Sequence, residues 1–137
     1  MSDVYGLIEA ALLTKLSANA NLSNLVGTRF HEDFAPAKTT VPFVRFAFIS
    51  GGDDNLAPRR GMDVLVQVEC YGTTRAQARD GAGYIDEALL NAELTVSGWS
   101  NWRTLGEQRI VLTEMYEGKQ VFRRGARYRI SADKNSS

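Results

Sequence analysis

The chain has 137 residues and a hydrophobic content of 44%, which is ordinary for a globular protein and too high for a disordered one. Its 16 basic and 16 acidic side chains cancel, so bulk charge gives no reason to expect a nucleic-acid or anionic-membrane binder. No apolar run approaches the roughly 20 residues of a membrane helix, and the first residues lack the basic region and apolar core of a signal peptide, so we expect cytoplasmic synthesis and no membrane partner.

The N-terminal segment is predicted to be helical. Asp3 is suited to cap a helix that runs to about Ala18, because apolar residues recur along this segment at helical spacing. Residues 19–27 predict a short helical turn that ends at its glycine. Residues 29–31 predict a short strand, and residues 32–40 predict a loop.

Two segments with strict alternation follow, over residues 43–50 and 62–71. In the second, one face carries Val64, Val66, Val68 and Cys70, and the other carries Asp63, Leu65, Gln67, Glu69 and Tyr71. Period two is typical of a sheet with one buried face. The sole cysteine, Cys70, is therefore interpreted as a buried structural thiol.

Residues 51–61 are predicted to form a long loop between these two strands. Hairpin loops usually take about two to five residues, and a compact domain rarely keeps a longer one unless it binds something or orders on assembly. The charged residues of this loop are Asp53, Asp54, Arg59 and Arg60. We take these four as candidate interface residues.

A second helix is predicted from a cap at Thr73 or Thr74 to about Asn91. Its apolar stripe consists of Ala78, Ala82, Ile85 and Leu89. The small side chains at its start would let the helix lie close to a sheet. Gly81 and Gly83 each weaken a helix interior by roughly 1 kcal/mol relative to alanine, and close approach to a neighbouring element would be a reason for them.

The C-terminal third is predicted to be mostly strand. Residues 94–96 predict a brief strand, and residues 97–102 predict a turn that holds both tryptophans. Tryptophans on a turn either cover the core or anchor an interface, and both interpretations stay open. Two longer strands follow, over residues 107–117 and 120–132, joined by a tight turn at Gly118 and Lys119.

These elements predict an α+β fold in one domain spanning residues 1–137, with residues 133–137 as a frayed tail. The sheet is expected to be mainly antiparallel, with four or more strands. Two helices are expected to pack on one of its faces, and a long loop is expected in the first hairpin.

Few residues suggest chemistry. His31 is the only histidine, and although Glu32 and Asp33 follow it, three adjacent side chains point in different directions, so a surface loop histidine is favoured over a metal site. The chain lacks a Gly-x-Ser-x-Gly elbow and a phosphate-binding glycine motif. We therefore expect no enzymatic activity, no cofactor and no catalytic or metal residues.

A basic cluster crowds the last hairpin and consists of Lys119, Arg123, Arg124, Arg127 and Arg129. It can pair across strands with Asp63 and Glu69 on the polar strand face, or it can form a charged surface that meets another subunit or lines a channel. Direct nucleic-acid readout is disfavoured, because we find no stacking aromatics beside these residues. The four arginines are candidate interface residues.

The order of these features resembles the small tail-terminator, or tail-completion, proteins of long-tailed bacteriophages with non-contractile tails. The similarity spans roughly residues 5 to 131. It rests on the N-terminal helix and on these segments: Leu-Val-Gly-Thr-Arg-Phe at 25–30, Ala-Pro at 35–36, Val-Pro-Phe-Val at 41–44, Val-Leu-Val-Gln-Val-Glu-Cys-Tyr-Gly at 64–72, Thr-Arg-x-x-Ala at 74–78 and Arg-Tyr-Arg-Ile at 127–130.

The resemblance implies a structural virion protein without enzymatic activity. It implies a homohexameric ring at the head-proximal end of the tail tube, which stops tube growth and joins the head connector. The partners would be further copies of the chain, the major tail-tube protein and a head-completion protein, after assembly in the host cytoplasm. Two alternatives remain: another head–tail connector or minor tail protein, and a non-viral α+β protein-binding module.

Overall fold

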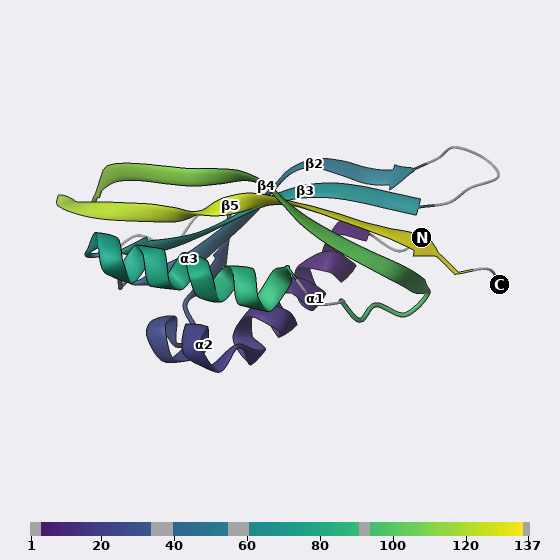
Figure 1. Cartoon of the computed structure of the whole chain (residues 1–137), viewed down its shortest axis with the longest axis horizontal. Coiled ribbons are helices and arrows are strands. Elements are labelled where there is room, and N and C mark those ends of the chain that lie inside the picture. Colours follow the sequence, from purple (N-terminus) through teal and green to yellow (C-terminus); the bar gives the residue numbers. More distant parts are fainter. Residues whose placement is uncertain (1–3, 34–39, 55–60, 91–93, 136–137) are drawn as a thin grey trace.

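A five-stranded sheet with helices on one side forms the fold (Figure 1). The computed structural model describes residues 4–33, 40–54, 61–90 and 94–135. The helices described are α1 (Val4–Ala18), α2 (Ala20–Val26) and α3 (Arg75–Leu89). The strands are β1 (Phe30–Glu32), β2 (Phe43–Asp54), β3 (Gly61–Gly72), β4 (Trp99–Tyr116) and β5 (Lys119–Lys134).

The strand order is β1-β2-β3-β5-β4, with β1 parallel to β2 and every other pair antiparallel. This confirms the prediction of an α+β fold with a mainly antiparallel sheet of at least four strands. The helix α3 contacts β3 and β5, and α1 and α2 contact α3 and each other. The short helical turn predicted at residues 19–27 is α2, which makes a third helix beside the two expected.

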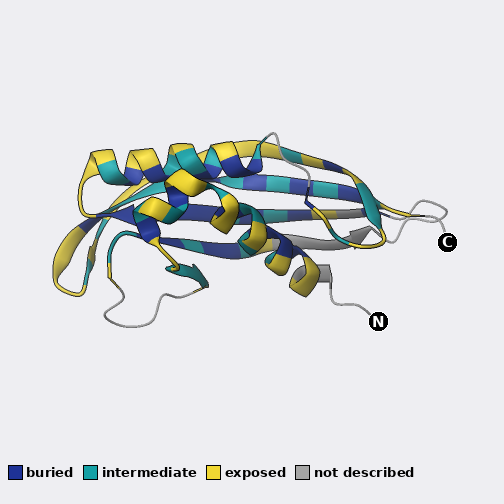
Figure 2. Cartoon of the chain, turned by 90° about the horizontal axis from the view of Figure 1, so that it is seen from below, coloured by how far each residue is buried: buried dark blue, intermediate teal, exposed yellow. Residues whose placement is uncertain are grey.

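The core lies between the helices and the covered face of the sheet, which we call the helix face. Buried positions alternate along the central strands (Figure 2), as period two requires. The fully buried strand residues of the helix face are Val44, Val64, Val66, Val68, Cys70, Tyr128 and Ile130. They pack against Ile8, Leu12 and Leu16 of α1, Leu22 and Val26 of α2 and Ile85 and Leu89 of α3. The predicted inward face of β3, including the buried thiol, is confirmed.

Capping residues set two of the helix boundaries. The Asn19 side chain accepts a hydrogen bond from the Leu22 amide at 2.9 Å, and Gly27 ends α2 at a positive φ of 63°. The Thr74 side chain accepts from the Gln77 amide at 3.0 Å and begins α3. The predicted cap Asp3 lies outside the described residues.

Gly81 allows α3 to lie close to β3. A Cβ atom added at Gly81 would lie 2.3 Å from the Cys70 Sγ atom, a distance that real side chains do not adopt. Close approach therefore explains this glycine, as predicted. A Cβ atom at Gly83 would meet nothing within 4 Å, so the same reason does not apply there.

The predicted loop 51–61 is shorter than expected. The strand β2 continues to Asp54 and β3 begins at Gly61, and the two are paired out to this last position. The glycine-rich and acidic composition of residues 51–54 indicated a loop, but the backbone of β3 supplies partners that extend the strand. The connecting residues 55–60 lie outside the described residues.

The start of β4 was also predicted wrongly. Residues 94–96 form no strand, the turn is limited to Ser97 and Gly98, and β4 begins at Trp99. Two bulges, at 100–103 and 106–108, interrupt the alternation that the sequence analysis relied on. Trp102 is buried and Trp99 packs against the core, so the tryptophans cover the core.

The ends of the last hairpin differ slightly from the prediction. The turn is formed by Glu117 and Gly118, both at positive φ (51° and 77°), and β5 begins at Lys119. Asp133 and Lys134 belong to β5, where they pair with β4, so the frayed tail was placed too early. Residues 136–137 lie outside the described part.

Candidate functional site

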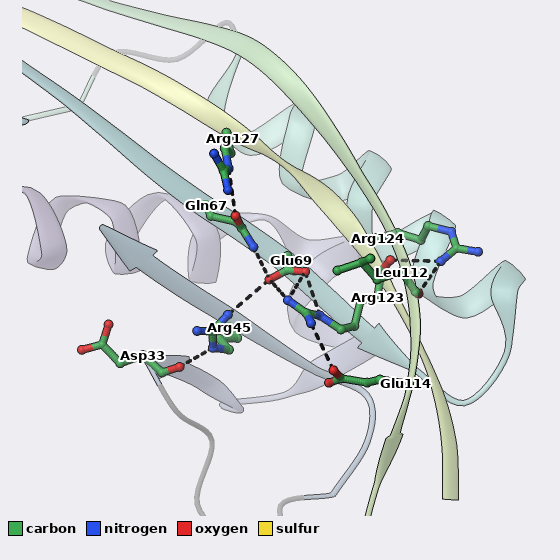
Figure 3. A network of polar contacts seen from close by, with 9 residues as sticks. All are labelled: Asp33, Arg45, Gln67, Glu69, Leu112, Glu114, Arg123, Arg124 and Arg127. Carbon is green, nitrogen blue, oxygen red and sulfur yellow. Dashed lines mark hydrogen bonds and ion pairs between the residues drawn. The ribbon is translucent and has the colours of Figure 1, made fainter. Parts of the chain in front are cut away.

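The candidate site is the face of the sheet opposite the helix face, which we call the open face. Its centre is Glu69 of β3, whose side chain is 0% exposed although its strand position alternates with the core residues. The Glu69 carboxylate accepts hydrogen bonds from Arg45 of β2, Gln67 of β3 and Arg123 of β5 (Figure 3). Alternation along residues 62–71 predicted a solvent-facing position for Glu69, and that prediction was wrong, because side chains from both flanking strands cover it.

Arg123 forms the tightest part of this network. Its Nε and Nη2 atoms donate to the two carboxylate oxygens of Glu69 at 2.9 and 2.8 Å, and its Nη1 donates to Glu114 of β4 at 3.1 Å. Such a two-pronged guanidinium–carboxylate contact is among the stronger hydrogen-bonded pairs. Burial lowers the pKa of Arg123, but the hydrogen bond and charge of Glu69 outweigh it and leave the pKa raised. Arg123 therefore joins β3, β5 and β4 as a permanent cation.

The network continues on both sides of Glu69. Gln67 donates to Glu69 at 2.9 Å and accepts from the Arg127 Nε atom at 3.0 Å. Arg45 donates to Glu69 at 3.3 Å and also to the backbone carbonyl of Asp33, which follows β1. The polar groups of the open face thus connect β2, β3, β5 and β4 in one chain of contacts.

A second, more exposed group lies further along β5. Arg129 donates to Glu107 at 2.8 and 3.2 Å and to Asp63 at 3.0 Å, so it bridges β4 and β3. The hydrogen bond from Arg129 lowers the pKa of Glu107, and that bond together with the charge of Asp63 raises the pKa of Arg129. Arg129 and Glu107 therefore stay charged at neutral pH and form a fixed ion pair at this end of the open face.

An aromatic cluster closes the other end of the open face. Phe43 stacks on Tyr71 with ring centroids 4.5 Å apart, and Tyr116 lies 5.6 Å from Phe43. The Arg123 guanidinium lies over the Tyr71 ring at 5.1 Å, so an aromatic does accompany the basic residues, contrary to the sequence analysis. Tyr71 is buried beneath these neighbours, and burial raises its pKa, so its ring is not presented for stacking on a base.

The structure separates the predicted basic cluster. Arg123, Arg127 and Arg129 lie on the open face and hold the acidic and amide groups of β3, which is the cross-strand pairing considered from the sequence. Arg124 points to the opposite face, where it donates to the Leu112 carbonyl at 2.8 Å and lies 5.9 Å from the Phe122 ring centroid.

The loop candidates are only partly placed. Asp53 and Asp54 lie in β2, opposite Met62 and Gly61 of β3. Arg59 and Arg60 lie outside the described residues.

Three residues of the site were missed. Arg45, Glu107 and Glu114 complete the two charged groups of the open face. The alternation of residues 43–50 puts Arg45 on the face opposite Val44 and Phe46, and the register of β2 against β3 places it beside Glu69. The register shift between Gly106 and Gln108 hid the position of Glu107.

His31 is not the surface loop residue that was expected. It lies in β1, its ring meets the edge of Phe43 with centroids 5.8 Å apart, and its Nε2 atom is buried without a hydrogen-bond partner within the described chain. Next to it, burial together with a hydrogen bond and the negative charge of Glu9 raises the pKa of Glu32 to about 7. Among the described residues, no group of three or more His, Cys, Asp or Glu side chains could hold a metal ion.

The open face is therefore built to hold charge in fixed positions. Its central carboxylate is neutralised by guanidinium groups within the chain, and its hydrogen bonds fix the side chains that surround it.

No described helix is long and apolar enough to span a membrane.

Comparison with solved structures identifies the class of fold. A chain in the structure titled "Virion of native gene transfer agent (GTA) particle" superposes with a TM-score of 0.69 at 20% identity, covering 97% of this chain and 99% of that one. The bacteriophage SPP1 gp17 protein superposes with a TM-score of 0.56 at 18% identity, covering 97% and 92%. The fold is thus shared with a chain of a virion particle and with a bacteriophage protein.

The family follows from the sequence itself. Residues 10–130 match the family described as tail completion protein gp17, so the chain belongs to that family, and the resemblance inferred from its motifs is confirmed. Membership gives the protein a structural role in the phage tail. A comparison with curated proteins gives no match.

Proposed function

We propose that the protein forms a ring at the head-proximal end of the phage tail tube, where it ends tube polymerisation and presents the surface that joins the head. The observation that carries this proposal is the match of residues 10–130 to the tail completion family. The proposed partners are further copies of the chain, as a hexamer, the major tail-tube protein and a head connector or head-completion protein. The ring is assembled in the host cytoplasm and remains in the virion, without enzymatic activity.

The geometry of the open face supports a contact role. Networks of charged side chains that are already ordered in the free subunit can meet a partner without a further cost of ordering them. Complementary charges also select the correct partner and its register more than they add affinity. A subunit that must recognise a tube end, a head connector and its own copies needs this kind of surface.

Two parts of the chain are proposed as the interface. The first is the end of the β2–β3 hairpin, with Asp53, Asp54, Arg59 and Arg60. The second is the basic hairpin, with Arg123, Arg124, Arg127 and Arg129. In this interface, Arg123 and Arg127 act indirectly, by holding their hydrogen-bonded partners in place. Arg129 acts directly, because its ion pairs are exposed.

The oligomeric state and the binding of tubes test the proposal directly. Light scattering on the purified protein should show a closed oligomer of defined size. Electron microscopy with tail tubes should show the protein only at tube ends, and tubes should stop growing when it is added. A protein that stays monomeric at high concentration and ignores tubes would be incompatible with a ring-forming terminator.

We predict that replacing Arg59 and Arg60 together by glutamate leaves the fold intact and weakens assembly. Both residues fall between β2 and β3, where the reversed charge would repel a partner suited to arginine. Circular dichroism should give a wild-type melting curve, and light scattering should show a smaller mass. Arg79→Glu on the exposed face of α3 serves as a matched control and should assemble normally. Normal assembly of the double variant would remove this segment from the interface.

A further inference from the structure

The sheet leaves a long edge open at β4. This strand pairs with β5 on one side, and no described strand pairs with its other side. Both bulges lie in its first half, up to residue 108, whereas residues 109–116 pair with β5 without a shift in register. Bulges blunt a strand edge against further pairing, so only the first half of β4 is protected in this way.

The unprotected half of β4 exposes apolar side chains. Val111 and Met115 are each 66% exposed, on the helix side of the strand, and Leu112 is 46% exposed on the open-face side. The charged residues of this stretch are already engaged within the chain, since Arg109 pairs with Asp86 and Glu114 pairs with Arg123. A regular, apolar edge strand with both faces exposed is a template for pairing with another strand.

The opposite side of the same sheet has a second open edge. The strand β1 pairs with β2 only at Val44, Arg45 and Phe46, and beyond these no described strand lies outside residues 47–54. Ile49 on this stretch is 43% exposed and lies at a shift in register of β2 against β3, between Phe48 and Ser50, beyond which residues 50–54 pair with β3 without a further shift. The two open stretches, 47–54 and 109–116, are equally long and each carries an exposed apolar residue, but the regular part of the β2 edge is the shorter one.

The strand directions allow these two edges to pair with each other in different copies. The strand β4 is antiparallel to β5, β5 to β3 and β3 to β2, so β4 runs opposite to β2. When two copies are placed side by side with their helices on the same side, β4 of one copy meets β2 of the next as an antiparallel strand. The stretches lie toward opposite ends of the long axis (Figure 1), so successive copies would be staggered, which is the shear that closes tilted strands into a barrel.

We propose that residues 109–116 of β4 pair as an antiparallel strand with residues 47–54 of β2 in a second copy of the chain. This contact rests on the proposed ring and specifies how its subunits join. It is heterologous, since two different edges meet, and repeated heterologous contacts form a ring when the rotation between successive copies closes. Pairing of β4 with β4 would instead stop at two copies and leave the β2 edge open.

Charge on the open edge tests the proposal. The double variant Val111→Lys and Met115→Lys should keep the wild-type melting temperature, because both side chains are exposed, and should weaken self-association at least about tenfold. The matched control is Leu105→Lys, since Leu105 is 61% exposed on the same strand but lies in the half that carries the bulges. The control should associate like the wild type, and equal losses in both variants would overturn the assignment to residues 109–116.

Cross-linking identifies the partner edge. Ile49→Cys protein and Leu112→Cys protein are mixed and treated with a bismaleimide long enough to tolerate a shift of two residues along the strands. The native Cys70 is buried, so it does not compete. We expect cross-linked pairs in the mixture and none in either variant alone. Efficient cross-linking of the Leu112→Cys variant with itself would show two-fold pairing of β4 and overturn the proposal.

The outcomes separate this inference from the proposed function. If the wild-type protein forms rings but neither the lysine variant nor the mixed cross-link behaves as expected, the edge pairing is wrong and the ring stands. If the wild-type protein stays monomeric at every concentration tested, both the ring and its edge pairing are wrong.

Discussion

A single carboxylate organises the open face. Glu69 is fully buried, and it is the only charged residue among the buried ones in the described part of the chain. An isolated buried charge is costly, and here the guanidinium groups of Arg45 and Arg123 compensate for it. Removing one charged group leaves its buried partners without a compensating charge. The free energy of unfolding then falls by more than the net contribution of the ion pair itself.

We predict that Glu69→Gln lowers the free energy of unfolding by about 2 kcal/mol, less than for a pair fully removed from water, because both arginines keep some solvent contact. Urea denaturation should show a lower midpoint with an unchanged slope. The control is Glu107→Gln, whose exposed carboxylate pairs with Arg129, and its midpoint should match the wild type. A wild-type midpoint for Glu69→Gln would mean that the network does not stabilise the sheet.

A second residue-scale prediction concerns pH. Burial, followed by a hydrogen bond to Glu9 and the charges of Glu9 and Asp33, raises the pKa of Glu32 from 4.5 to about 7 in the folded protein. The folded state therefore holds this proton more tightly than the unfolded state does, and stability falls as pH rises from 4.5 to 7. The Glu32→Gln variant resembles the protonated form, so its stability should fall less than that of the wild type as the pH rises.

The melting temperature of Glu32→Gln relative to the wild type should therefore increase between pH 4.5 and pH 8, by roughly 3 °C once solvent screening is allowed for. Asp80→Asn, an exposed residue of α3, provides the control and should keep the wild-type pH dependence. If the difference in melting temperature between Glu32→Gln and the wild type stayed constant across this pH range, the Glu9–Glu32 contact would not be coupled to folding.

At the scale of elements, the contact between α3 and β3 depends on one missing side chain. Gly81→Ala would force its new methyl group against Cys70, whereas Gly83→Ala would place the same group in open space. We predict that the first substitution destabilises the protein by about 2 kcal/mol through overpacking. The second should stabilise it by up to about 1 kcal/mol, because alanine favours the helix.

Thermal unfolding of the two variants measures this contrast, and each serves as the control for the other. Opposite signs are expected although the chemical change is identical and the residues are two positions apart on one helix. Equal effects would indicate that α3 does not lie as close to β3 at Gly81 as the structure shows.

Regular elements could be predicted from the sequence, and interrupted ones could not. The strand β3 alternates without a break, and Asn19, Gly27 and Thr74 mark helix ends through local hydrogen bonds or a positive φ, so these features are visible in a short window. The start of β4 was missed because its bulges shift the alternation. Residues 51–54 were predicted as a loop because pairing with a partner strand, which local composition does not show, extends β2.

At the scale of the whole molecule, the site depends on register between strands that are distant in sequence. The alternation of the strands predicts that Glu69, Arg123, Arg127 and Arg129 can pair across strands. The pairing itself requires that β5 lie between β3 and β4, which no local pattern specifies. The burial of Glu69 is harder still to predict from the sequence, because it arises only when Arg45 and Arg123 converge from both sides.

The interior position of β5 also governs when the protein can fold during its synthesis. This strand pairs with β3 on one side and with β4 on the other, and it is the last strand of the described chain. A ribosome must therefore have synthesised residues through Lys134 before the sheet can close, and until then β3 and β4 have no common partner. A nascent chain that ends before β5 therefore lacks a closed sheet and cannot present a finished surface to its partners.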